Sequence, residues 1–422
     1  MRFLSGLKLV FLLFLKLLIS GILFLMALPF AIWARLVHRS GPIKKILIAG
    51  IETSANMIQI SSILSESAGY QVYVAQFEEH PYYPPIQNGK IRVFNELTTW
   101  MFDSPIVGIL KSIKRNFFLF RAIFAFDIVL FNWNRSFLYY NLDYLIFALA
   151  NKVLIVRQCG DEVRYRPLQH GIHSHFGINQ WQNGQRNFFE MMYKLRCQRM
   201  AESFAIVIST KDHATFQGRD LFVRPYIQKA LKKTEGLYRE VPLIIHAPSD
   251  TQIKGTDLVI QVMEKLKSQG YKFEFELLTG LKNTVVLERL SQAAIVIDQP
   301  GAVPARFAVE AMASGCVVIG GNVVEINGLE GCPVIPFLPQ AASLESSVRE
   351  LLDNPSFRVA KGEESYRYWK ENFSSEAFLT YFERLLDRKA KQFSRFENQF
   401  DLLYGSAETW YEKVLLKTIY KN

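Results

Sequence analysis

Cysteine is scarce in this sequence and shows no pairing pattern. The 422 residues include four cysteines, and neither a CxxC motif nor a histidine at zinc-finger spacing accompanies them. A disulfide framework and a structural zinc site are therefore not expected, and the wide spacing suits a reducing compartment. The four positions are Cys159, Cys197, Cys316 and Cys332.

Acidic metal-binding motifs, internal repeats and low-complexity segments are missing as well. No D-x-D sequence occurs in the chain, and the spacing of His170, His173 and His175 fits no standard metal site. No repeat of fixed short period is visible. The sequence therefore predicts neither a metal site nor a repeat architecture.

Charge is sparse but biased to one sign. Charged residues make up 21% of the chain and apolar residues 50%, with a mean hydropathy of +0.08. This composition excludes a disordered chain and a multi-span membrane protein. The net charge of +10 favours an anionic partner, which could be nucleic acid, an acidic lipid surface or a phosphorylated substrate. Because the basic residues are dispersed and no recognised RNA or DNA module is present, we predict no nucleic-acid partner.

One long uncharged run lies near the N-terminus. Residues Leu17–Ala34 are mostly apolar and approach the roughly 20 residues that a helix needs to cross about 30 Å of hydrocarbon. They predict a membrane helix within an anchor of residues 1–40. Lys16 could extend this helix by snorkelling, and Pro29 could kink it. A cleaved signal peptide is the alternative, because the first residues are basic, but no small-x-small cleavage site follows the run.

The chain is basic directly after this run. Arg35, Arg39, Lys44 and Lys45 lie there, and by the positive-inside rule they place the rest of the chain in the cytoplasm. The basic N-terminus argues in the opposite direction. We predict a single-pass protein of the cell membrane with cytoplasmic domains.

A second segment also has a composition typical of membrane surfaces. Residues 106–126 combine four basic side chains with five phenylalanines, so that a helix there could lie on an anionic bilayer. The alternative is an ordinary helix that packs its aromatic face on the sheet.

The rest of the chain predicts an α/β fold with two sheets. Apolar strand-like runs alternate with helix-like stretches, and the pattern restarts after the polar segment Gln228–Glu240. We assign residues 41–228 and 229–375 to two Rossmann-like, doubly wound domains that face a cleft, and 376–422 to C-terminal helices for which the first domain is one available packing surface. The expected strands are 45–50, 70–75, 127–131, 152–156 and 204–208, then 241–246, 273–278, 294–298, 315–319 and 334–337.

The segment 298–315 carries the clearest chemical signal. It runs from a strand end through a Pro/Gly loop into a short helix that ends at a glycine. A helix start offers free N–H groups to a phosphate, and Gly301 would allow close backbone approach. Glu310, just over one turn into the helix, could accept hydrogen bonds from two ribose hydroxyls. The alternative is that Glu310 caps or pairs on a helix surface.

These residues resemble a known family. The run Glu310-Ala-Met-Ala-Ser-Gly-Cys-Val-Val-Ile is similar to the "EAMA-x-G-x-PVI" signature of two-domain (GT-B) glycosyltransferases of the family 4-like group. His246-Ala-Pro-Ser, followed by Lys254-Gly255-Thr256, resembles the "HAPS…KGT" entry to their nucleotide-binding domain. The resemblance covers residues 241–381 and implies that Lys254 contacts the diphosphate of a nucleotide-sugar donor, beside Gly255, Gly301 and Glu310.

The sequence departs from the family pattern at two points. The first acid of the family's acidic pair lies eight positions before the second, and here that position is Ala302. The arginine that often precedes the lysine is also absent. Arg306 could replace it, because a guanidinium at the helix start can bind phosphate oxygens in bidentate fashion; the alternative is a solvated surface arginine.

A loop in the first domain supplies the candidate catalytic residues. Residues 157–164, Arg-Gln-Cys-Gly-Asp-Glu-Val-Arg, follow a strand and resemble the "G-x-D-x-R" loop of related enzymes, with Glu162 where aspartate is usual. Glu162 and Arg164 at a cleft edge could orient a sugar hydroxyl or assist proton transfer, and an internal salt bridge is the alternative. We expect no metal and no cofactor, with the leaving diphosphate neutralised by Lys254 and backbone amides.

Together these features predict a membrane-associated glycosyltransferase. It would move a sugar from a nucleoside diphosphate sugar to a hydroxyl of a glycan or lipid-linked acceptor, in cell-surface polysaccharide or glycolipid synthesis. The resemblance implies retention at the anomeric carbon. The alternative, motivated by Ala302 and the missing arginine, is a catalytically silent relative that serves as a membrane scaffold or subunit.

Overall fold

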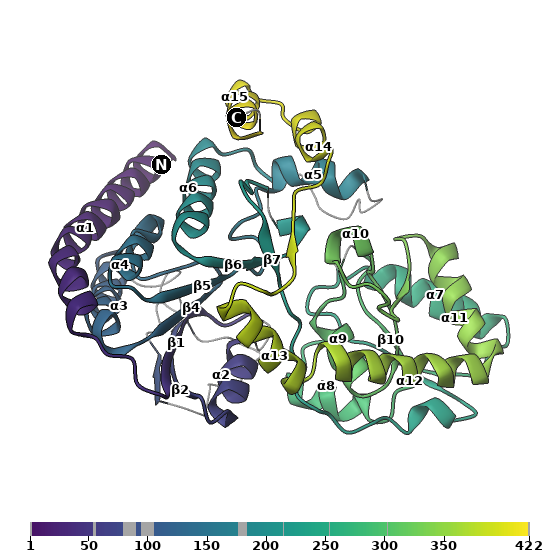
Figure 1. Ribbon diagram of the computed structural model, residues 1–422. Helices are drawn as coiled ribbons and strands as arrows, with labels where there is room; N and C mark the ends of the chain where they lie inside the picture. Colours follow the sequence, from purple (N-terminus) through teal and green to yellow (C-terminus); the bar gives the residue numbers. More distant parts are fainter. Residues whose placement is uncertain are drawn as a thin grey trace.

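The chain forms two α/β domains, each built on its own sheet (Figure 1). The computed structural model describes residues 2–53, 56–78, 90–93, 105–175, 184–213, 215–252, 254–301 and 303–420, without the side chains of 2–13, 78, 90–93, 105–114 and 212. The predicted α/β class is confirmed. Ala302 lies outside the described residues, as do the side chains at the start of the segment 106–126.

The first sheet is doubly wound. Among the described residues it has eight strands in the order β13-β7-β6-β5-β4-β1-β2-β3, all parallel to their neighbours except β13, which runs antiparallel to β7. The strands are β1 (Lys44–Ile51), β2 (Tyr70–Glu78), β3 (Lys90–Val93), β4 (Ile128–Asn132), β5 (Val153–Arg157), β6 (Ile206–Ser209), β7 (Leu221–Val223) and β13 (Gln392–Phe393).

Alternation along β1 explains why helices cover both faces of this sheet. Ile46 and Ile48 point into one apolar cluster, and Leu47 and Ala49 point into another. One face carries α2 (Asn56–Glu66) and α13 (Ser375–Leu386). The other face carries α1 (Arg2–Val37), α3 (Pro105–Ala125), α4 (Asp143–Leu149) and α6 (Phe188–Phe204).

The second domain repeats the arrangement on a smaller scale. Its strands, within the described residues, are all parallel, in the order β12-β11-β10-β8-β9. One face packs on α7 (Thr256–Ser268) and α11 (Ala341–Asp353), and the other on α8 (Asn283–Leu290), α9 (Arg306–Ala313) and α12 (Pro355–Asn372). The strands are β8 (Leu243–His246), β9 (Glu274–Leu277), β10 (Ile295–Ile297), β11 (Val317–Gly320) and β12 (Ile335–Pro336).

Helix α1 contains the long apolar run. Within it, Phe14–Val37 forms a 24-residue stretch apolar enough to cross a membrane, and Pro29 lies inside the helix. The helix packs lengthwise against α3 and α4 (purple in Figure 1). Helix α3 buries Phe118 in the same cluster and leaves Phe117 exposed.

The C-terminal segment returns to the first domain (yellow in Figure 1). On α13, Phe378, Phe382 and Leu385 are buried against the first sheet, and β13 becomes an edge strand of that sheet. Beyond them, α14 (Gln399–Gly405) packs on α5 (Arg166–His175), and α15 (Trp410–Tyr420) packs on α14. The chain therefore crosses between the domains twice.

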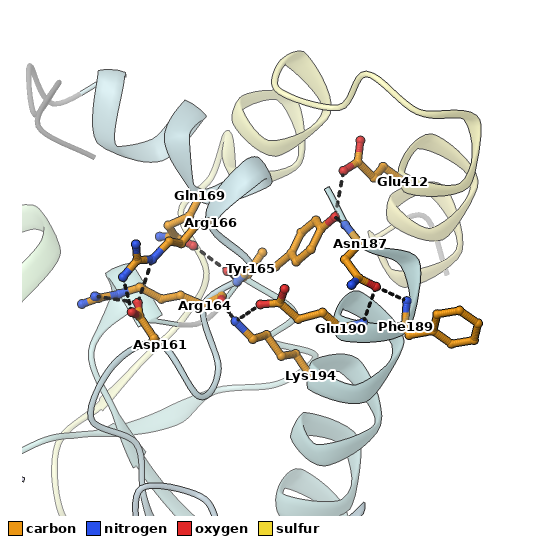
Figure 2. Close-up of polar contacts among 11 residues, drawn as sticks. Asp161, Arg164, Tyr165, Arg166, Gln169, Asn187, Phe189, Glu190, Lys194 and Glu412 are labelled. Atoms are coloured by element: carbon orange, nitrogen blue, oxygen red, sulfur yellow. Dashed lines mark hydrogen bonds and ion pairs between the residues drawn. The ribbon is translucent and has the colours of Figure 1, made fainter. Parts of the chain in front are cut away.

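A buried tyrosine fastens α15 in place. The Tyr165 hydroxyl donates to Glu412 Oε1 over 3.3 Å and accepts from the Asn187 N–H over 3.1 Å, as Figure 2 shows. Arg186 Nη1 lies 2.6 Å from the other Glu412 oxygen. We expect Tyr165→Phe to lower the free energy of unfolding by about 1 kcal/mol, because the Asn187 N–H and the buried Glu412 carboxylate each lose a partner. Urea titration measures this, with Tyr238→Phe at an exposed tyrosine as the control; equal midpoints for the two variants would contradict the expectation.

Candidate functional site

A cavity of about 350 Å³ opens at the carboxyl ends of strands β8 and β10. Because both strands are parallel, their ends meet at one edge of the sheet, beside the starts of α8 and α9. The lining combines apolar side chains with one ammonium group, one guanidinium group and two carboxylates. All of these residues belong to the second domain. The lining residues are Ala247, Pro248, Ser249, Asp250, Lys254, Leu278, Gly280, Leu281, Asn283, Val286, Gln299, Ala305, Arg306, Phe307 and Glu310.

Glu310 lines this cavity although its side chain is almost completely buried, with 2% exposed. Its Oε1 accepts hydrogen bonds from Arg306 Nε at 2.9 Å and from Asn283 Nδ2 at 3.2 Å. The carboxylate therefore lies in the cavity wall rather than on a helix surface. Asn283, at the start of α8, carries no sequence signal that would have marked it.

Arg306 is held on three sides. Besides the bond from its Nε to Glu310, its two terminal nitrogens donate to the Ile227 carbonyl and to Gln228 Oε1, at the junction between the domains. Only 14% of its side chain is exposed, so the solvated surface arginine considered from the sequence does not describe it. In this arrangement the guanidinium ties α9 to the interdomain junction, and binding a phosphate would require it to exchange partners.

Lys254 also lines the cavity. Its ammonium is 3.0 Å from Asp298 Oδ1, and the other Asp298 oxygen accepts from the Ala305 N–H at 2.9 Å. Asp298 is buried at the end of β10. The pair therefore joins the Lys254 loop to the loop that leads into α9.

The two predicted glycines shape the loops without lining the cavity. Gly255 has φ +64° as the residue before α7, and Gly301 has φ +154°. Side chains rarely adopt such backbone angles, so glycine suits both turns. A Cβ atom at Gly301 would meet no heavy atom within 4 Å, so that close backbone approach is sterically open there.

His246 connects the structural parts of the site. Its Nδ1–H donates to the Ile297 carbonyl at 2.8 Å, which leaves Nε2 to accept from the Thr256 hydroxyl at 3.0 Å. The imidazole thus links β8, β10 and the start of α7. Burial lowers the pKa of His246 below its ordinary value of 6.5.

Acid is therefore expected to destabilise the second domain through His246. Below about pH 6.5 the unfolded chain binds a proton at this residue that the folded chain does not, so the free energy of unfolding falls by up to about 1.4 kcal/mol per pH unit. His246→Gln should flatten this pH dependence between about pH 5 and 6.5. Urea titrations across that range test it. His175→Gln, at an exposed histidine, is the control, and a slope that His246→Gln leaves unchanged would contradict the prediction.

In the first-domain loop that supplies Glu162 and Arg164, Glu162 bonds to the backbone of the loop itself. Glu162 Oε1 accepts from the Cys159 N–H at 2.5 Å, and burial raises the pKa of this carboxyl. Arg164 Nη1 lies 3.8 Å from Asp161 Oδ1, and Arg166 pairs with the same aspartate (Figure 2). The salt bridge formed here thus uses Asp161. Neither Glu162 nor Arg164 belongs to the lining of the second-domain cavity.

One aromatic residue near this loop escaped the sequence reasoning. Trp133 follows β4 with φ +70°, an angle that non-glycine residues rarely adopt. Its ring edge, Glu162 Oε2 and Arg164 Nη1 each lie 3.9 Å from the position that a Cβ on Gly160 would occupy. Backbone strain of this kind clusters at functional sites, so Trp133 joins Glu162 and Arg164 as a candidate site residue.

Metal ligands do not cluster in the described part of the chain. Over those residues, no three His, Cys, Asp or Glu side chains come together as a metal site would need. His170 Nε2 instead lies 3.2 Å from the Ser174 hydroxyl. Metal independence stays a prediction.

Comparison with known proteins identifies the fold. No protein-family model matches the sequence, and no curated protein matches it either. Solved structures do match. Sucrose-phosphate synthase from Thermosynechococcus elongatus is 14% identical, with a TM-score of 0.56 over 82% of this chain and 98% of its own.

Two further structures cover the same share of this chain, 82%, and all of their own. Anabaena HepE, in complex with UDP and glucose, has 12% identity and a TM-score of 0.53. An α-glucosyltransferase, in complex with UDP and a DNA that contains an HMU base, has 10% identity and a TM-score of 0.51. At these identities the likeness establishes the fold: two Rossmann-like domains in the GT-B arrangement.

Proposed function

We propose that this chain transfers a sugar from a nucleoside diphosphate sugar to a hydroxyl group of a glycan or lipid-linked acceptor. The observation that carries the proposal is the cavity of about 350 Å³ at the ends of β8 and β10, whose lining includes both a buried carboxylate, Glu310, and a lysine, Lys254. In parallel α/β sheets this edge is where nucleotides bind.

The charges of the lining residues suggest a role for each of them. Lys254 would neutralise the diphosphate as the bond between it and the sugar C1 breaks, and Glu310 would accept from the ribose hydroxyls. The acceptor oxygen forms the new bond to C1 as the bond from C1 to the diphosphate breaks, and its proton passes to the departing diphosphate. Glu162 and Arg164, with Trp133 beside them, are the groups we propose for the acceptor side, with retention at C1.

Uracil is the nucleobase we propose first. Both HepE and the α-glucosyltransferase were solved with UDP, and they share the fold of this chain. Synthesis of a cell-surface polysaccharide or glycolipid at the cytoplasmic membrane face would bring such a donor together with the apolar helix α1. No cofactor or metal enters this scheme.

A donor screen tests the proposal. Full-length protein in detergent is expected to show a higher Tm with UDP than with buffer, and with UDP-glucose than with glucose, because a ligand that binds only the folded state stabilises it. Guanosine and adenosine diphosphates complete the panel. Released nucleoside diphosphate in the presence of membranes then reports transfer. No thermal response to any nucleotide would overturn the proposal.

A second candidate is the catalytically silent scaffold. Two observations favour it. Ala302 stands where the family has an acid, and the charged groups of the cavity are already paired with one another, Glu310 with Arg306 and Lys254 with Asp298. Nucleotide binding without release of nucleoside diphosphate, across membranes that contain the natural acceptor, would support it.

A further inference from the structure

Helix α1 has two opposite apolar stripes, and only one of them is covered. Leu23, Ala27, Ala31 and Ala34 are buried in the core cluster that α3 and α4 share. The other side of the helix is exposed along its described length. Its large side chains include Phe14, Leu18, Ile22, Leu25, Ile32 and Leu36. The inner stripe is rich in alanine, which allows close helix packing, whereas the outer stripe is bulky.

Polar contacts fix α1 to the first domain at both ends of the packed region. The Tyr139 N–H donates to Ser20 Oγ at 3.0 Å. At the other end, His38 contacts the Phe124 carbonyl at 3.1 Å and Asp127 Oδ1 at 2.8 Å. The stretch that is long enough to span a bilayer is therefore the stretch held against the domain. If it crossed the membrane upright, either these contacts would break or α3 and α4 would enter the hydrocarbon with it.

A second exposed apolar patch lies at the joint between α6 and α15. Phe189 is 74% exposed and Trp410 is 76% exposed, and Val414 is exposed near them. Phe188 and Tyr411, whose rings are 5.4 Å apart, hold this aromatic corner together. Isolated domains seldom leave aromatic side chains this open, and tryptophan favours membrane interfaces.

Ring contacts connect the aromatic corner to α1. Tyr193 on α6 lies 5.1 Å from the ring of Tyr139, and the Tyr139 N–H is the donor to Ser20 of α1. In the view of Figure 1, α6 and α15 are drawn toward the same end of the first domain as the N-terminus of α1. Tyr139 and Tyr193 therefore link α1 to α6, the helix that begins at the aromatic corner.

The charged residues of α1 and α3 and of the segment that follows α1 are all basic. Residues 1–51 and 105–125, which include α1 and α3, contain no Asp or Glu. Arg35, Arg39, Lys45 and Arg121 are exposed there. A bulky apolar stripe flanked by cations without carboxylates matches the surface of an anionic bilayer, where apolar burial and attraction to lipid head groups add.

We propose that the chain is monotopic: α1 lies in the plane of an anionic bilayer with its outer stripe in the lipid, and the aromatic corner around Phe189 and Trp410 is a second anchor. This gives the form of the membrane association proposed above in place of a single-pass span. It does not depend on the sugar transfer, because nucleotide binding is measured separately in detergent.

Vesicle binding tests the second anchor. The full chain should bind vesicles of equal parts phosphatidylcholine and phosphatidylglycerol and bind phosphatidylcholine vesicles less well. The double variant Phe189→Ser, Trp410→Ser should bind the anionic vesicles about tenfold more weakly, because two large aromatic side chains no longer leave water. Both residues are exposed, so folding is unaffected. Tyr238→Ser with Leu338→Ser, at exposed positions of the second domain, is the matched control.

Membrane topology tests the helix. With an epitope tag at either end of the chain, a monotopic protein exposes both tags to protease on the same side of sealed inverted membrane vesicles. Tags on opposite sides would establish a single-pass helix and overturn the proposal. The proposal would also be overturned if the aromatic double variant bound vesicles as tightly as the wild type. It would be overturned as well if the chain formed dimers and did not bind vesicles.

Discussion

Replacing Glu310 by alanine is expected to weaken nucleoside diphosphate binding about hundredfold. Each hydrogen bond between a ribose hydroxyl and a buried carboxylate contributes more than a neutral pair, because the acceptor carries charge in a site of low dielectric. Glu310 is a buried carboxylate of the cavity wall, and it accepts a hydrogen bond from Asn283 at the start of α8. Titration calorimetry with UDP measures the change.

The same substitution also leaves Arg306 without its carboxylate partner, so a loss of stability must be separated from a loss of binding. Glu310→Gln keeps the shape and one carbonyl acceptor, and it should bind more weakly than the wild type but more tightly than Glu310→Ala. Glu264→Ala, at an exposed glutamate on α7, is the control. Wild-type affinity in a folded Glu310→Ala protein would remove the proposed ribose site.

Lys254→Met is expected to lower turnover about a thousandfold, the scale on which losing a group that stabilises developing charge slows an enzyme. The diphosphate gains negative charge as its bond to the sugar breaks, and Lys254 is the ammonium group in the cavity lining. Donor binding should fall less than turnover, because the ground state needs the cation less than the transition state does. Release of UDP from UDP-sugar is the measurement.

Asp298 complicates this variant, because methionine leaves its buried carboxylate without the ammonium at 3.0 Å. The double variant Lys254→Met, Asp298→Asn removes that unpaired charge. If the slow turnover comes from the lost diphosphate contact, the double variant stays slow. Recovery of turnover in the double variant would show that Lys254 serves only to neutralise Asp298. Lys272→Met, at an exposed lysine, is the control.

The strands that support the site could be predicted from local sequence. Residues 241–246 and 294–298 are short apolar runs bounded by polar turns, and the structure places β8 and β10 within them. Because both strands are parallel neighbours, their ends had to share an edge, and Lys254, Arg306 and Glu310 line one cavity there. Whether they bind a nucleotide stays a prediction.

Contacts between distant segments could not be predicted in this way. The Ile227 carbonyl and Gln228, which hold Arg306, lie in a segment whose polarity indicated only a linker. β13 has two residues and no pattern of its own, and it exists because β7 offers an open edge. The face that α1 buries is likewise decided by α3 and α4, since the apolar run alone gives no preferred side.

The return of the C-terminal segment to the first domain has a consequence for biosynthesis. All strands of the second sheet lie between Leu243 and Pro336, whereas the first sheet is completed only by β13, after α13 has covered Ile46 and Ile48. During translation the second domain can therefore fold as soon as it emerges from the ribosome, while the first sheet still lacks the part of its cover that α13 adds beside α2. The domain made first is the domain finished last, and until α13 arrives the apolar surface that Phe378, Phe382 and Leu385 will cover is where a chaperone would be expected to bind.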